Sequence, residues 1–366
     1  MNVFRPILLL LLFTVPAQAQ TIFTDDFVGD FPAALLSIDG YLYVGTLETG
    51  TPQRISRIEI ENPKNIEFVS DFESAPGFGV WKMAYNQAEN EIYAYDVFFY
   101  RVDLDQSLPI DKELLFGEGN ACSDGIAQKD GIIYLACSDS IDRLDATQVD
   151  PTIEEVIDLS SFGTPRNPAV FGNELYFSVS DNGDSDLYKI DLADPANTLE
   201  LVSNLDQNSG GVQSALVADN FLYLGVEGTP HRVLKLDLSN TNYPIAEEVL
   251  IDNFSGGPIG LARNGNTIYL TDGNTQNIFQ FTDNELSVDQ AETNKIEIYP
   301  VPANDLLFVR GLETDSPYVI YNTTGAQVRS GRTSNGQIAI QSLNTGLYFL
   351  QLRGARQNFN LRFVKE

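Results

Sequence analysis

The sequence predicts an all-β protein in which a six-bladed β-propeller is followed by a small immunoglobulin-like β-sandwich. Three observations lead to this fold class. A tyrosine recurs six times at intervals of about 40–50 residues, each tyrosine lies among four short apolar segments, and the charge balance changes near residue 290. We expect a signal peptide at 1–19, the propeller at 20–284, a linker at 285–293 and the second domain at 294–366.

The first residues have the layout of an export signal. Arg5 precedes the apolar run Ile7–Phe13, and Ala17-Gln18-Ala19 provides the small residues that signal peptidase requires. The apolar run is too short to cross a membrane, which takes about 20 apolar residues. We therefore expect cleavage after Ala19 and an exported chain without a transmembrane segment.

The repeat is defined by tyrosine and by the residue three positions before it. The six tyrosines are Tyr43, Tyr93, Tyr134, Tyr176, Tyr223 and Tyr269. Glycine or asparagine precedes them, as Gly40, Asn90, Gly131, Asn173, Asn220 and Asn266. Both residue types tolerate the left-handed conformation that a tight hairpin needs. Four short strands in each repeat of this length are typical of a propeller blade.

The two ends of the repeat region are expected to meet. The sixth repeat has no clear fourth strand after Asn277–Phe281, whereas the mature N-terminus, Thr21–Phe27, is similar to the fourth strand Val249–Phe254 of the fifth repeat. The first strand would complete the last blade. Ring closure of this kind removes exposed sheet edges that would favour aggregation.

The sixth repeat, Gly260–Asn274, resembles NHL-type propeller repeats, in which an aspartate follows the second strand as Asp272 does here. The other five repeats match more loosely. The resemblance therefore implies a fold and no particular activity.

The two cysteines are expected to form a disulfide. Export places Cys122 and Cys137 in an oxidising compartment. Asp130-Gly131 between them is a strong hairpin signal, and pairing of Lys129 with Ile132 would bring the cysteines within one diagonal step of each other. The alternative is that both are free, small hydrophobic residues.

The last 73 residues read as alternating strands of a small β-sandwich, with Leu306–Val309 facing Leu347–Leu352 across its core. They also resemble the type A C-terminal sorting domain of the type IX secretion system of Bacteroidetes. The resemblance rests on four blocks in order, whose marker residues are Tyr299, Pro300, Pro302 and Ala303, then Gly325, then Gly346 and Tyr348, and finally Lys365. Val301 departs from the asparagine that is usual in the first block.

The resemblance implies an interaction with the type IX secretion machinery and passage across the outer membrane. It further implies removal of the domain and attachment of the remaining protein to a surface lipopolysaccharide. The alternative is an ordinary immunoglobulin-like adhesion module. The 73 residues lie at the C-terminal end of the sequence, and a cleavable export sequence lies at the other end. This arrangement favours the sorting domain over the adhesion module.

Composition excludes several classes of function. The chain has 22 Lys and Arg against 51 Asp and Glu, a net charge of −29, with 45 acidic and 13 basic residues in 21–290. Nucleic-acid binding depends on basic residues that neutralise phosphates, so we expect none. One histidine and two cysteines disfavour a His/Cys zinc site and a histidine-centred catalytic triad. We expect no cofactor, and a monomer.

The channel face of the propeller is the candidate binding site. The entrances to the first strands carry Pro32, Trp81, Asp124, Asn167, Gln213 and Ile259. Trp81 offers a stacking surface, and hydrogen bonds are available from Asp124, Arg166, Asn167 and Gln213, a combination that is typical of sites for a glycan or peptide ligand. The alternative is that Trp81 plugs the channel and the polar residues are hydrated.

The competing hypothesis is a calcium-dependent lactonase or hydrolase of the gluconolactonase type. That chemistry needs several oxygen ligands around one ion, and Asp124 is the sole carboxylate among the six entrance residues. Asp181, Asp184 and Asp186 are further candidate calcium ligands, although a solvated turn is the favoured interpretation. His231 is expected in a loop. We therefore favour a non-catalytic binding or interaction protein.

Overall fold

The computed structural model describes residues 20–25, 31–47, 53–72, 79–117, 122, 124–181, 184–205, 209–254, 257–273, 275–286, 297–310, 316–322, 326–333, 336–353 and 358–366. The regular structure in these ranges is β, apart from the 3-10 turn η1 at Pro195–Asn197. None of the helical structure described could cross a membrane. The predicted all-β class is confirmed.

Six four-stranded antiparallel sheets follow one another along the described chain up to residue 282. The first three consist of β2 (Phe31–Ile38), β3 (Tyr41–Leu47), β4 (Gln53–Glu59) and β5 (Asn62–Phe72); β6 (Lys82–Asn86), β7 (Glu91–Tyr95), β8 (Phe99–Asp103) and β9 (Glu113–Phe116); and β10 (Ile126–Lys129), β11 (Ile132–Ala136), β12 (Ser140–Asp145) and β13 (Ile153–Asp158). The other three consist of β14 (Thr164–Phe171), β15 (Glu174–Asp181), β16 (Asp184–Asp191) and β17 (Glu200–Asn204); β18 (Ser209–Ala218), β19 (Phe221–Gly228), β20 (His231–Asp237) and β21 (Glu248–Phe254); and β22 (Pro258–Asn264), β23 (Thr267–Asp272), β24 (Ile278–Thr282) and β1 (Thr21–Thr24).

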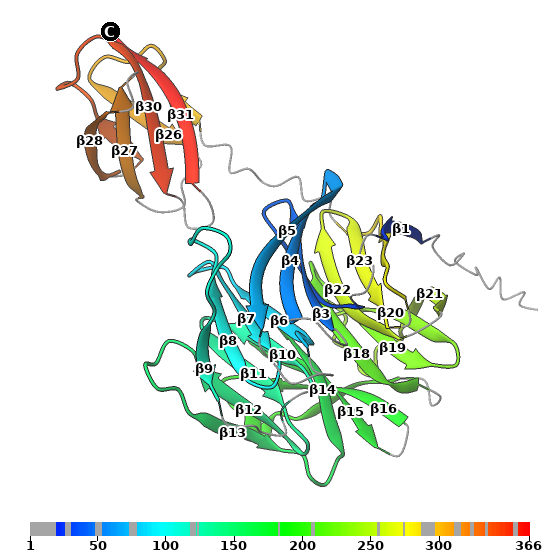
Figure 1. Ribbon diagram of the computed structural model, residues 1–366. Helices are drawn as coiled ribbons and strands as arrows, with labels where there is room; N and C mark the ends of the chain where they lie inside the picture. Colours follow the sequence, from blue (N-terminus) through cyan, green and yellow to red (C-terminus); the bar gives the residue numbers. More distant parts are fainter. Residues whose placement is uncertain are drawn as a thin grey trace, which may run out of the picture.

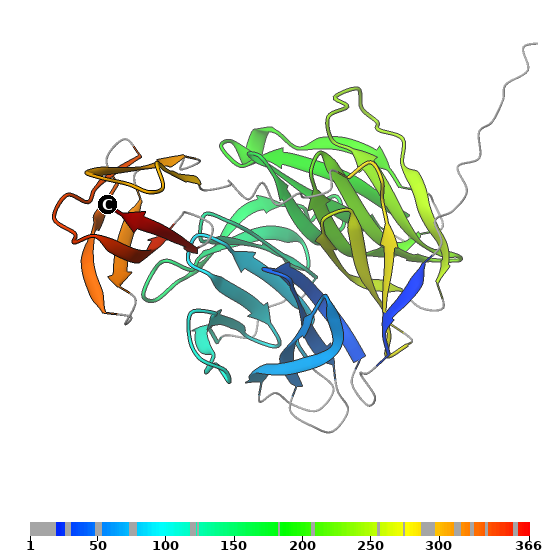
Figure 2. The ribbon, with the colours of Figure 1, turned by 90° about the horizontal axis from the view of Figure 1, so that it is seen from above.

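The sheets lie around a common centre (Figures 1 and 2). Their first strands touch in the order β2, β6, β10, β14, β18 and β22, and β22 touches β2 again. The sixth sheet takes its outer strand from the N-terminal segment, because β1 pairs with β24 through Thr21–Gln280 and Ile22–Phe279. The predicted pairing of the two ends is confirmed.

A separate apolar cluster fills each interface between neighbouring sheets. The six interfaces are represented by Ile55 with Ile92, Phe99 with Leu135, Ile141 with Phe177, Leu187 with Leu222, Val233 with Leu270, and Leu42 with Tyr269. Each sheet is therefore buried on both faces, which explains why the second strands read as continuous apolar runs.

The repeated tyrosine belongs to a polar row that crosses each sheet. Every one of the six is buried on a second strand, opposite a side chain of the third strand that is basic in the first five sheets. The pairs are Tyr43–Arg57, Tyr93–Arg101, Tyr134–Arg143, Tyr176–Lys189, Tyr223–Lys235 and Tyr269–Gln280. A fourth-strand glutamate extends the row in the first five sheets, as Glu67, Glu113, Glu154, Glu200 and Glu248. In the first five sheets the row gives the buried phenol group charged neighbours across the strands, and in the sixth the neighbour is the amide of Gln280.

The hairpin prediction needs a correction in three repeats. Gly40 and Gly131 have the expected positive φ, at 80° and 82°, and so does Asn90 at 57°. Beside Asn173, Asn220 and Asn266 the positive φ belongs instead to the preceding residue, which is Gly172, Asp219 or Gly265. These two-residue loops place only their first residue in the left-handed region, as a type II′ turn does, whereas a type I′ turn places both there.

The C-terminal residues form two sheets. One contains β25 (Glu297–Tyr299), β26 (Leu306–Arg310) and β29 (Gln337–Ala339); the other contains β27 (Pro317–Asn322), β28 (Gln327–Arg332), β30 (Gly346–Arg353) and β31 (Asn358–Lys365). Leu307 and Val309 share one apolar cluster with Leu350 and Leu352, so β26 and β30 face each other as predicted.

The start of the expected linker packs against the sixth sheet. Leu286 is 2% exposed within the apolar cluster between the fifth and sixth sheets, and Glu285 pairs with Lys235. The packed structure therefore continues to residue 286.

Candidate ligand-binding site

A cavity of about 60 Å³ lies where the six first strands meet. Every first strand contributes to its lining, which shows that the cavity occupies the centre of the ring. The lining residues are Ala34, Leu35, Trp81, Lys82, Met83, Ile126, Asn167, Pro168, Ser214, Ala215, Ile259, Gly260 and Leu261. Of the predicted entrance residues, Trp81, Asn167 and Ile259 line this cavity, whereas Pro32 lies in β2 opposite Thr46.

Trp81 stands immediately before β6, where its backbone N–H donates to the carbonyl oxygen of Tyr95 at 3.1 Å. This bond fixes the residue at the end of the strand. The side chain is 38% exposed, so part of the indole faces solvent while the rest lines the cavity. A partly exposed indole beside a cavity can stack on a ligand.

Lys82, the first residue of β6, extends across the cavity and connects three sheets. Its Nζ donates to Oδ1 of Asn167 on β14 and to the carbonyl oxygen of Gln213 on β18, at 2.6 Å each. Burial lowers the pKa of Lys82 to about 8; the nearby Asp124 carboxylate opposes this shift and Arg166 adds to it. Desolvation disfavours the charged form because neutral oxygens replace only part of the lost hydration.

Asn167 is held by both its backbone and its amide. Its backbone N–H donates to the carbonyl oxygen of Asp124 at 2.8 Å, and Nδ2 donates to the carbonyl oxygen of Val212 at 2.7 Å. Its φ of 44° lies in the left-handed region, within the irregular part of β14. Asparagine tolerates this conformation better than most residues, and the amide is thereby aimed at Lys82.

Arg166 and Asp124 form an ion pair at the same face, with Nη1 3.3 Å from Oδ1. The Nε of Arg166 is buried and has no hydrogen-bond partner within the described part of the chain. The Gln213 side chain turns outward, and its Nε2 donates to Oε2 of Glu227 at 2.6 Å. The structure thus brings together the four predicted polar residues, Asp124, Arg166, Asn167 and Gln213. Three of them contribute their side chains, whereas Gln213 contributes its backbone carbonyl oxygen.

Lys82 was missed by the sequence reasoning, and so was Glu227. The sequence did contain a signal for Lys82. Basic residues are rare in 21–290, where there are 13, and Lys82 begins a first strand whose next residues, up to Tyr85, are apolar or small. Glu227 carries no comparable signal, because acidic residues are frequent throughout this region.

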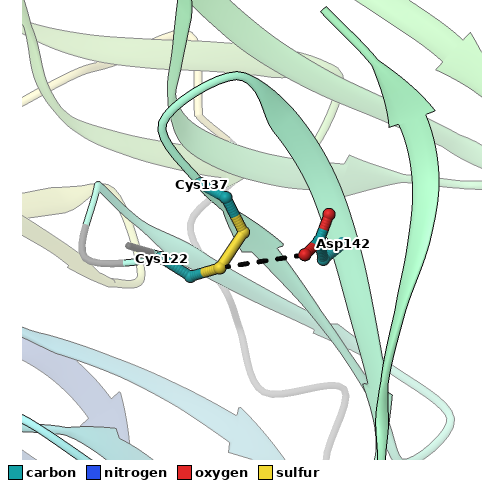
Figure 3. Close-up of side chains that lie close together, drawn as sticks. All are labelled: Cys122, Cys137 and Asp142. Carbon is teal, nitrogen blue, oxygen red and sulfur yellow. Dashed lines mark hydrogen bonds between the residues drawn. A yellow bond between two sulfur atoms is a disulfide. The ribbon is translucent and has the colours of Figure 1, made fainter. Parts of the chain in front are cut away.

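The predicted disulfide is present between Cys122 and Cys137, which are 15 residues apart in the sequence (Figure 3). The hairpin register is the predicted one, with Lys129 opposite Ile132. Asp142 on β12 points toward the bridge, with Oδ2 3.9 Å from Sγ of Cys122. Burial raises the pKa of Asp142, against the lowering effect of the hydrogen bond from Ser140.

Cys122, Cys137 and Asp142 are also the single group of three potential metal-ligating side chains found among the described residues. The two sulfurs are bonded to each other, and a metal needs them as thiolates. The group therefore does not hold a metal in the oxidised protein.

The other calcium candidates lie on a hairpin. Asp181 and Asp184 are backbone partners at the ends of β15 and β16, and their side chains lie outside the described part of the structure. Asp186 is paired within β16 opposite Val179. His231 was expected in a loop but opens β20, where its Nδ1 accepts a hydrogen bond from the Gly228 N–H at 3.1 Å.

The marker residues of the sorting domain meet in the two C-terminal sheets. Ala303 is fully buried beside Lys365, and its backbone N–H donates to the Val364 carbonyl oxygen at 2.8 Å. Gly346 pairs with Lys365, and Tyr348 stacks on Phe363 at 5.6 Å. Tyr299, which precedes Pro300 and Pro302, stacks on Phe308 at 5.4 Å. Gly325 and Ala19 lie outside the described residues.

Residues 297–366 match the family model described as the secretion system C-terminal sorting domain. The predicted sorting domain is therefore confirmed, and it indicates export to the cell surface or the extracellular space. None of the curated proteins matches the chain.

Three solved structures are similar to the larger part of the chain. A chain of a nidogen/laminin complex has a TM-score of 0.52 at 18% identity and covers 66% of this chain and 88% of its own. The PQQ-bound aldose sugar dehydrogenase of Streptomyces coelicolor has a TM-score of 0.55 at 14% identity, with 73% and 99% covered. A luciferin-regenerating enzyme has a TM-score of 0.53 at 9% identity, with 74% and 97% covered. At these identities the similarity shows a propeller-like fold alone.

Proposed function

We propose that this chain is a surface-exposed, non-catalytic binding protein that the type IX secretion system exports. The observation that carries the export proposal is the sorting domain at residues 297–366. In this proposal a signal peptide at 1–19 directs the chain through the inner membrane, and the sorting domain, of type A, then directs it across the outer membrane.

We assign the binding role to a six-bladed propeller that spans residues 20–284 and ends in the packed segment up to residue 286. The closed cycle of first strands and the six apolar interfaces support this blade count. An NHL-like origin is supported by the sixth repeat. We place an immunoglobulin-like sandwich at 294–366, and we propose that the exported protein is a monomer.

The channel face supports binding because its polar groups are ordered by one another. Asn167 and the Gln213 carbonyl hold Lys82, and Asp124 pairs with Arg166, while part of Trp81 remains exposed. Pre-ordered polar groups beside an exposed aromatic ring lose little conformational entropy when a ligand binds.

The test is a binding survey of the purified, exported protein on glycan and peptide arrays. Trp81→Ala should weaken binding at least tenfold, because a central tryptophan in an interface contributes more than about 1.4 kcal/mol. The control is Phe162→Ala, which removes another aromatic side chain that is 44% exposed and does not line the cavity. Unchanged binding by Trp81→Ala would place the ligand site elsewhere on the protein.

A further inference from the structure

The lysine in the channel carries a charge that its hydrogen-bond acceptors do not neutralise. Both acceptors of Lys82 Nζ are neutral oxygens, one from the Asn167 amide and one from the Gln213 backbone. Ammonium groups offer three donors, and the described residues take two of them. A buried charge is stabilised most by an opposite charge, so this geometry favours an anion as the third partner.

Arg166 adds a second donor group at the same face. Asp124 pairs with Nη1 of Arg166 at 3.3 Å, while Nε of Arg166 is buried and makes no hydrogen bond to the residues that the structure describes. Among the described residues, Asp124 and Arg166 are the charged groups that shift the pKa of Lys82, and these three residues together have a net charge of +1. This positive group stands out in a chain whose net charge is −29.

The dimensions of the site limit what can enter. A cavity of about 60 Å³ has room for a few water molecules, and therefore for a group the size of a carboxylate. The body of a ligand must stay at the mouth, where the partly exposed indole of Trp81 provides a flat surface. A sugar ring can lie on that surface, whereas a peptide side chain would have to fit into the small cavity.

We propose that the channel binds a saccharide that carries one carboxylate group, a uronate, whose ring lies on Trp81 and whose carboxylate accepts hydrogen bonds from Lys82. The inference rests on the proposed binding function and names its ligand class. The carboxylate would replace hydration of the ammonium with a charge-assisted hydrogen bond. Arg166 would contribute through its positive charge at the same face.

The experiment uses the fluorescence of Trp81, which is the single tryptophan of the chain. The full exported protein is titrated with D-glucuronate, with the neutral D-glucuronamide and with D-glucose. We expect glucuronate to bind at least tenfold more tightly than either neutral sugar. Lys82→Met should remove this preference, since methionine is an unbranched side chain only one atom shorter than lysine and carries no charge.

Lys129→Met is the matched control. Lys129 also donates to a backbone carbonyl and to an asparagine amide, those of Gly172 and Asn173, but it lies at the opposite end of a first strand and outside the cavity. This variant should retain the preference for glucuronate. Circular dichroism of both variants checks that they fold.

A second measurement needs no substitution. Because the pKa of Lys82 is about 8, the protonated fraction of its amine falls about tenfold between pH 7 and pH 9. The affinity of the wild-type protein for glucuronate should fall by a similar factor, and its affinity for glucose should not.

Equal affinity for glucuronate and glucuronamide would overturn the inference while leaving the binding function in place. A response of Trp81 to a peptide carboxylate and to no sugar would also overturn it, with a peptide as the ligand. Array binding that survives Trp81→Ala, together with no response to any of these probes, would overturn the inference and the placement of the ligand site in the channel. Absence of any array binding by the wild-type protein would overturn the proposed binding function itself.

Discussion

The ion pair between Lys235 and Asp283 provides the sharpest test of how the ring is held together. Both side chains are 3% exposed, and Nζ lies 2.8 Å from Oδ2. Lys235 is on β20 of the fifth sheet, and Asp283 directly follows β24 of the sixth. Tyr223 also donates to Asp283 at 2.6 Å. The pair therefore connects two neighbouring sheets.

Asp283→Ala should lower the free energy of unfolding by about 3–5 kcal/mol, because it leaves a buried ammonium without its buried counter-charge. The matched comparison is Glu285→Gln. Glu285 contacts the same ammonium at 2.6 Å, but its side chain is 66% exposed. Solvent screens that interaction, so we expect this change to cost less than about 1 kcal/mol.

The contribution of Asp283 should also depend on pH. Burial by itself would raise the pKa of Asp283, but hydrogen bonds from Lys235 and Tyr223 outweigh it and hold the pKa below the ordinary value. The stabilisation is therefore complete above the unfolded-state pKa of about 4, and it is lost as the pH falls through the lower native pKa. The difference in stability between wild type and Asp283→Ala should shrink in that acidic range.

The assay is urea unfolding followed by Trp81 fluorescence, which reports on the ring and not on the C-terminal domain. The slope of the transition should be the same in all three proteins, so that the midpoints compare stability directly. A cost for Asp283→Ala within about 0.5 kcal/mol of that for Glu285→Gln would refute the reasoning, because burial would then have no effect on the strength of the pair.

Two further predictions concern the disulfide and the ring closure. Denatured, exported protein should show no reactive thiols, and two titratable thiols would contradict the bridge. Reduction of the Cys122–Cys137 bridge should lower the free energy of unfolding by about 3 kcal/mol, which is the chain-entropy value for a loop of about 15 residues. Gly260→Ala should destabilise the ring by about 1–3 kcal/mol in the same urea assay, because the added Cβ would overlap the Ala33 carbonyl oxygen at the contact between β22 and β2. Gly273→Ala is the control, since its Cβ would have its nearest neighbours at an ordinary 3.5 Å, and equal costs would argue against the close approach.

The repeat was predictable because each sheet repeats the same local requirements. The tyrosine and the turn residue recur in every repeat, and the apolar second strand identifies the part that is buried on both faces. The pairing of β1 with β24 followed from counting strands. What the spacing could not show was which turn residue is left-handed, since Gly172-Asn173 and Asp130-Gly131 suit different turn types.

The site was predictable only in part, because it depends on contacts between distant sheets. Trp81 and Asn167 were found from their positions at strand entrances. The bond from Lys82 to Asn167 spans 85 residues, and the bond to the Gln213 carbonyl spans 131. The second uses a backbone atom, which the identity of residue 213 does not indicate. The fourth-strand glutamates of the polar rows were missed for a similar reason, since their register depends on the bulges between third and fourth strands.

The most direct test of the central claim is to follow the ring to the cell surface. Intact type IX-competent cells would express either the full chain or a chain that ends at residue 286, which packs in the ring and is the last residue described before 297. Protease accessibility of the ring would be measured on both. A fluorescent protein that carries residues 1–19 and 287–366 tests whether these segments are sufficient. We predict that the full chain and the fusion reach the surface, while the shortened chain stays protected in the periplasm. Equal surface exposure of the full and shortened chains would contradict the claim that residues 297–366 direct export.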